Sequence, residues 1–61
     1  MITNLKVDDS VILTSPYLKA CCGSLGRVVY VDNHCVKVKF VVDSTPVVYS
    51  FNYNNLPIRK M

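Results

Sequence analysis

Apolar and polar residues alternate along this chain with the period of a β-strand. The clearest alternation lies within residues 35–41, where the apolar positions are Val36, Val38 and Phe40. The positions between them are Lys37 and Lys39. Because successive side chains of a strand point to opposite faces, the apolar set should face a core and both lysines should face water.

Three further segments have the composition of short strands. They cover residues 7–13, 25–31 and 47–51, and the last of them alternates through Val47, Tyr49 and Phe51. No segment keeps a helical period over three turns. The pattern therefore predicts a small all-β barrel of four to five short antiparallel strands, because closing a short sheet on itself removes its exposed edges.

Turn-forming residues separate these segments. Residues 14–24 should form a long loop that contains Ser15-Pro16, and residues 32–33 and 43–46 should form turns. We expect a short helical turn near residues 52–55, after which residues 56–58 return to the barrel. This organisation predicts one domain over residues 1–61, with its core at about residues 7–58.

Composition limits the kind of protein. The chain has 61 residues, 51% of them apolar, and a net charge of +3. Its apolar runs are far shorter than the roughly 20 residues of a membrane helix or the roughly 7–15 of a signal peptide. An odd number of cysteines, three, favours reduced thiols over a disulfide framework. We expect a cytoplasmic protein without membrane contact.

Residues capable of metal binding or catalysis are few. Cys21-Cys22 and His34-Cys35 are adjacent pairs, whereas structural zinc sites space two ligands by two to four residues so that both reach one ion. The small thiols are better explained as partly buried apolar groups. The single histidine lies in a predicted turn, with no group to orient it as a base. We expect no catalytic residues, no metal and no cofactor, and thus not an enzyme.

A basic and aromatic set of side chains suggests a nucleic-acid contact. Lys37 and Lys39 share one face of their strand, Arg27 belongs to the preceding strand, and Tyr30 adds a stacking surface. Cations interleaved with aromatic rings suit RNA or single-stranded DNA. The alternative is a solvated outer face that only keeps a small barrel soluble.

The order of several short motifs resembles a known family. Pro16-Tyr17, then Gly26-Arg27-Val28, then Thr45-Pro46-Val47 followed by Phe51 is similar to the pattern of KOW domains, above all the C-terminal KOW domain of the bacterial transcription factor NusG. The resemblance implies an SH3-like barrel. Gly26 would then allow a close backbone approach or a bulge where the strand curves.

The resemblance also implies a docking function on the transcription or translation machinery. In NusG-type domains, an apolar loop rim contacts proteins such as a small-subunit ribosomal protein and the termination factor Rho. The matching positions here are Tyr17, Leu18, Val41 and Val42. We expect a monomeric module that docks through this rim, with RNA as a further partner of the basic face.

Two other functions stay open on the sequence. The chain could bind RNA or DNA directly, as a small KOW protein without a protein partner. It could also be a phage-type accessory or inhibitor protein, in which the barrel is a scaffold and the loop at residues 19–24 carries recognition. That loop is longer than in NusG and contains Cys21-Cys22.

Overall fold

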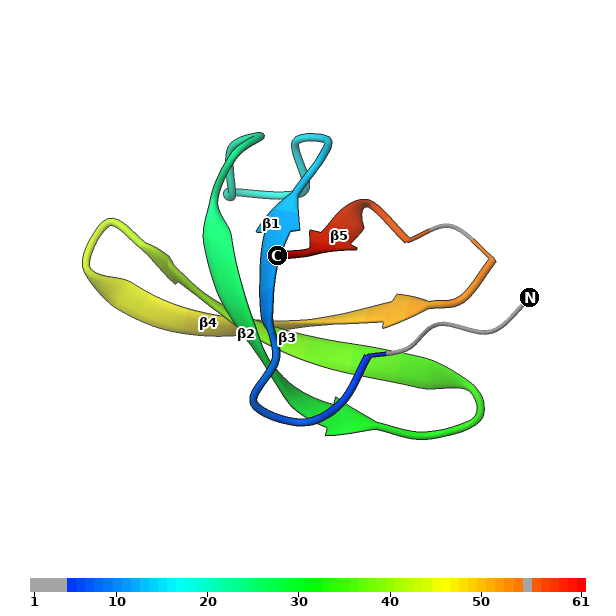
Figure 1. Cartoon of the computed structure of the whole chain (residues 1–61). Helices are drawn as coiled ribbons and strands as arrows, with labels where there is room; N and C mark the ends of the chain where they lie inside the picture. Colours follow the sequence, from blue (N-terminus) through cyan, green and yellow to red (C-terminus); the bar gives the residue numbers. More distant parts are fainter. Residues whose placement is uncertain (1–4, 55) are drawn as a thin grey trace.

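The structure, a computed structural model, describes residues 5–54 and 56–61. Its five antiparallel strands form one sheet: β1 (Ser10–Leu13), β2 (Leu25–Val31), β3 (Cys35–Val42), β4 (Thr45–Asn52) and β5 (Ile58–Lys60). The strand order is β4-β3-β2-β1-β5, so β1 to β4 follow one another and β5 returns beside β1 (Figure 1). The predicted fold class, a small all-β barrel of four to five short antiparallel strands, is confirmed.

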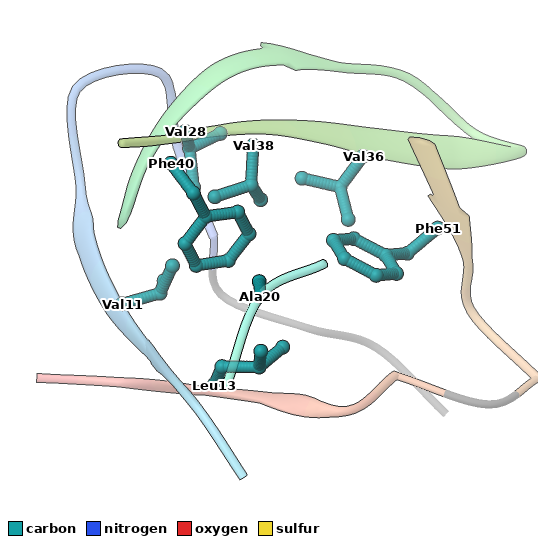
Figure 2. Close-up of a cluster of buried hydrophobic side chains, with 8 residues drawn as sticks. All are labelled: Val11, Leu13, Ala20, Val28, Val36, Val38, Phe40 and Phe51. Carbon is teal, nitrogen blue, oxygen red and sulfur yellow. The ribbon is translucent and has the colours of Figure 1, made fainter. Parts of the chain in front are cut away.

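The curled sheet encloses a core of side chains from four strands and one loop. Figure 2 shows these side chains pointing into a common interior, with the Phe40 and Phe51 rings among them. The alternation predicted for β3 is confirmed, because its apolar residues are buried and Lys37 and Lys39 are exposed. The fully or nearly fully buried residues are Val11, Leu13, Ala20, Val28, Val36, Val38, Phe40 and Phe51.

The hairpin between β3 and β4 is tighter than the sequence predicted. Asp43 and Ser44 have φ angles of 52° and 65° and form the whole turn between Val42 and Thr45. Two successive residues with positive φ are typical of a type I′ hairpin, whose twist matches that of the strands it joins. The strand therefore begins at Thr45, and Pro46 lies inside it, which β4 tolerates because it is an edge strand.

The first predicted strand is wrong in its N-terminal half. Residues 7–9 form a turn in which Asp8 has a φ of 77°. The backbone N–H of Asp9 donates to the Lys6 carbonyl at 3.0 Å, and the Asp9 carboxylate accepts from the Lys6 N–H at 2.8 Å. Short acidic side chains tolerate this left-handed conformation and bond to nearby backbone, so the polar residues make a turn before β1.

The predicted helical turn near residues 52–55 is also not formed as expected. Asn52 ends β4, and residues 53–54 form a turn without a helix, while residue 55 lies outside the described residues. The Tyr53 hydroxyl donates to the carbonyls of Asp32 and Cys35, at 2.7 and 3.2 Å. These bonds tie the end of β4 to the β2–β3 turn.

Across residues 5–54 and 56–61, the structure has no helix of the length and apolarity needed to cross a membrane.

Gly26 lies where β2 passes closest to the core, as the sequence suggested. A Cβ atom built there would lie 2.6 Å from Phe40 Cε1 and 2.7 Å from Val38 Cγ1. Real carbon atoms do not approach so closely, so any larger residue would displace the Phe40 ring. The bulge is a separate feature three residues later, where the register shifts between Val28 and Tyr30.

Replacing Gly26 tests this packing. We expect Gly26→Ala to lower the free energy of unfolding by about 1–3 kcal/mol, because the added methyl overpacks a filled core. Urea denaturation of the wild type and the variant measures the loss. In a Phe40→Leu background the same change should cost clearly less, since a smaller side chain makes room. An equal cost in both backgrounds would contradict the proposed clash.

Candidate functional site

The register of β2 and β3 gathers four predicted residues on the outer face of the sheet. Arg27 is the partner of Lys39, and Tyr30 is the partner of Lys37. All four side chains are exposed. We call this set, Arg27, Tyr30, Lys37 and Lys39, the basic face.

A β-bulge places Tyr30 on this face. Strict alternation would put position 30 on the same side as the buried Val28, but Val29 is an extra residue in the β2–β3 ladder. Because a bulge opposes two residues to one on the partner strand, the side chains beyond it change faces. Tyr30 thereby turns outward beside Lys37, and Val31 packs against the core.

Two contacts orient the Tyr30 ring. The Lys37 ammonium lies over the ring, with Nζ 5.2 Å from its centroid, a cation–π arrangement. The Tyr30 hydroxyl donates to Asp32 Oδ2 at 2.8 Å, and this bond to the carboxylate raises the pKa of Tyr30 above its ordinary value of 10.0. The hydroxyl therefore stays protonated and the aromatic surface keeps its position.

Asp32 is the centre of the adjoining turn. Its Oδ1 accepts the backbone N–H groups of Cys35 and His34, at 2.8 and 2.7 Å. These two bonds, followed by that from Tyr30, stabilise the charged form and lower the pKa of Asp32 from 3.8 to about 2. The carboxylate is ionised at neutral pH, and its oxygens are engaged by the turn and by Tyr30.

The predicted rim residues do not form one exposed surface. Tyr17 is half-buried, with its ring centroid 4.8 Å from that of Phe51 and 5.3 Å from that of Tyr49, in edge-to-face arrangements. The turn that holds it is closed by reciprocal backbone bonds between Tyr17 and Ala20, at 3.0 and 2.9 Å. Tyr17 is therefore only partly exposed, because its loop packs the ring against the core.

The remaining rim residues divide between the faces of the molecule. Val42 points inward and packs against the core. Leu18 is 76% exposed at the tip of the tight turn, where its φ is 52°, and Val41 is 65% exposed on the outer face of β3. Positions 37, 39 and 41 share one face of β3, so Val41 lies on the same side of the sheet as the basic face.

An open hollow of about 520 Å³ adjoins the basic face at β1, β2 and β3. The apolar side chains that line it are exposed to solvent, since Leu25 is 63% and Met61 68% accessible. Leu25 was not singled out from the sequence. It lies two residues before Arg27 in β2, so alternation places both side chains on the outer face. Nothing in the sequence indicated Met61. It lies beside β1 because its backbone N–H donates a hydrogen bond to the Ser10 carbonyl at 3.0 Å. The lining residues are Ser10, Leu25, Gly26, Arg27, Lys39, Val41 and Met61.

The cysteines differ from expectation in their exposure. Cys21 and Cys22 are exposed free thiols and only Cys35 is partly buried, so burial does not explain the first two. Cys22 Sγ lies 3.4 Å from the Thr14 carbonyl oxygen, a weak hydrogen bond. Within the part of the chain that the structure describes, no three histidine, cysteine or acidic side chains gather to hold a metal ion. His34 lies exposed in its turn, as predicted.

Comparison of the chain with protein-family models, with curated proteins and with solved structures found no match.

The Asp32 turn should make stability depend on pH below the neutral range. Because the folded-state pKa is below the unfolded one, the stabilisation is present above pH 4 and is lost as pH falls through 2. We expect Asp32→Asn to lower the melting temperature at pH 7. Between pH 4 and pH 2, the melting temperature of the variant should fall much less than that of the wild type. Thermal unfolding followed by circular dichroism measures both. Parallel pH profiles would show that another carboxyl group is responsible.

Proposed function

We propose that this barrel is an RNA-binding module that acts through its basic face. The observation that carries the proposal is the strand register, which aligns Arg27 with Lys39 and Tyr30 with Lys37 on one exposed surface. Three cations and an aromatic ring thus lie on two neighbouring strands. The rim residues, in contrast, are split between the core and the surface.

The chemistry of this surface suits a flexible polyanion. Lysine and arginine on a sheet face attract phosphates and release their counterions, which supplies most of the affinity for a nucleic acid. An oriented aromatic side chain offers a stacking surface that any base can use. RNA presents unpaired bases in loops and single strands, where proteins recognise most RNA sequences.

The ordered motifs support the same class of function. The resemblance to KOW domains rests on Pro16-Tyr17, Gly26-Arg27-Val28 and Thr45-Pro46-Val47, and the second of these supplies one cation of the basic face. Gly26 is the register partner of Phe40, and the next residue, Arg27, is the partner of Lys39. The motif and the surface are therefore physically connected, which favours a KOW-like binding role over catalysis.

The salt dependence of RNA binding tests the proposal. For three phosphate contacts with a single strand, the logarithm of the binding constant should fall against the logarithm of salt concentration with a slope of about −2. Lys39→Ala removes one contact, so the slope should become shallower by about 0.7. Fluorescence anisotropy with a labelled single-stranded RNA at several salt concentrations measures both slopes.

Lys19→Ala is the matched control, because it removes the same charge from the exposed loop between β1 and β2. It should leave the slope almost unchanged. Equal effects of the two substitutions would show non-specific attraction by net charge. Binding that barely responds to salt, or no binding at low salt, would reject the basic face as an RNA site.

The exposed apolar side chains favour a second candidate, docking on a protein of the transcription or translation machinery. Leu18 and Val41 are both more than half exposed, and an apolar side chain in water is stabilised when a partner buries it. Affinity capture with nuclease treatment separates the candidates, because a protein partner is retained and an RNA-bridged one is lost. A protein that the wild type retains after nuclease treatment, and that Leu18→Ser or Val41→Ser loses, would support docking.

A further inference from the structure

The geometry points to the hollow beside the basic face as the position of an unpaired base, so that the module selects single-stranded over double-stranded RNA. This inference rests on the proposed function and adds the class of nucleic acid to it. The hollow has no role in the fold core, since its apolar side chains lie on the outer face of the sheet. Any group that occupies the hollow therefore comes from outside the barrel.

The lining of the hollow matches the faces and edges of a base. Leu25, Val41 and Met61 offer exposed apolar surface, which is stabilised when a flat aromatic group covers it. Ser10 adds a hydroxyl that can donate to or accept from a base edge. The open shape admits a planar group from the side of the sheet.

Charge favours a nucleotide over a purely apolar occupant. Arg27 and Lys39, which are register partners, line the same hollow and also belong to the basic face. Among residues 5–54 and 56–61, no acidic side chain lines it. A base is joined through its ribose to a phosphate, so a base in the hollow brings its phosphate within reach of these cations. The row continues to Lys37 and Tyr30, which gives the neighbouring nucleotides a path along the sheet.

Base pairing would remove this advantage. In a duplex the bases are stacked inside the helix, and an A-form duplex offers mainly its shape, phosphates and hydroxyls to a protein. The cations could still touch duplex phosphates, but the apolar hollow would stay uncovered. The two halves of the surface, cationic and apolar, are used together only when a base is free.

Three labelled probes of equal length test the inference in fluorescence anisotropy: a single-stranded RNA, its duplex, and an abasic strand that keeps the phosphates. The wild type should bind the single strand about fivefold or more tightly than either of the others, which is the low end of the effect of one stacked base. Leu25→Ser should weaken single-strand binding by a similar factor and leave duplex and abasic binding unchanged. Val41→Ser should behave in the same way.

Val48→Ser is the control, because Val48 is 53% exposed and pairs with Lys39 but does not line the hollow. It should leave all three affinities unchanged, and thermal unfolding verifies that each variant is folded. Equal wild-type affinity for the three probes, or no effect of Leu25→Ser and Val41→Ser, would overturn the base position while the salt-dependent basic face remains. No binding of any probe at low salt would overturn the proposed function as well.

A peptide of alternating glutamate and leucine provides the competing occupant. If it binds the wild type in a manner that depends on Leu25 and the RNA probes do not, the hollow is a peptide site and the inference is wrong. If it fails to displace bound single-stranded RNA, the base position is supported against this alternative.

Discussion

The backbone of β2 passes so close to the side chains of Phe40 and Val38 that position 26 has room only for glycine. This contact lets the sheet curl over its own core, and it holds Gly26 opposite Phe40 in the β2–β3 ladder. Because side chains alternate along both strands, the same register places the residues at 27 and 39 side by side on the opposite face. The packing that closes the core therefore also builds the basic face.

The outer face acquires its second half through an irregularity. The bulge at Val29 turns Tyr30 outward to Lys37, while Asp32 holds the Tyr30 hydroxyl and closes the following turn. Tyr53, at the end of β4, bonds to the backbone of the same turn. Hydrogen bonds from the ends of β2 and β4 thus stabilise the turn beside the Tyr30 ring. The bond from the Tyr30 hydroxyl to Asp32 fixes the orientation of that ring.

The long loop between β1 and β2 has a structural role as well as an exposed tip. Ala20 is buried and Tyr17 packs edge-to-face on Phe51, so the loop covers part of the core. Each such aromatic pair contributes about 0.5–1.5 kcal/mol beyond the area it buries, which matters in a domain this small. Leu18, at the tip, is left to solvent. The exposed apolar residues that lie beside the cations, Val41 and Leu25, therefore belong to the sheet and not to this loop.

The sequence by itself determined the approximate positions of β2, β3 and β4 and the buried face of β3, because a period of two is a local property that each segment carries alone. β2 was predicted with its observed bounds, the buried set of β3 was correct, and Gly26 was correctly assigned a close approach. Only the tertiary structure decided which outer residues meet. The bulge that turns Tyr30, the loop that draws in Tyr17 and the approach of Met61 to β1 depend on contacts between segments distant in the chain. Such contacts leave no periodic trace in the residues, since they follow from how the sheet curls around its core.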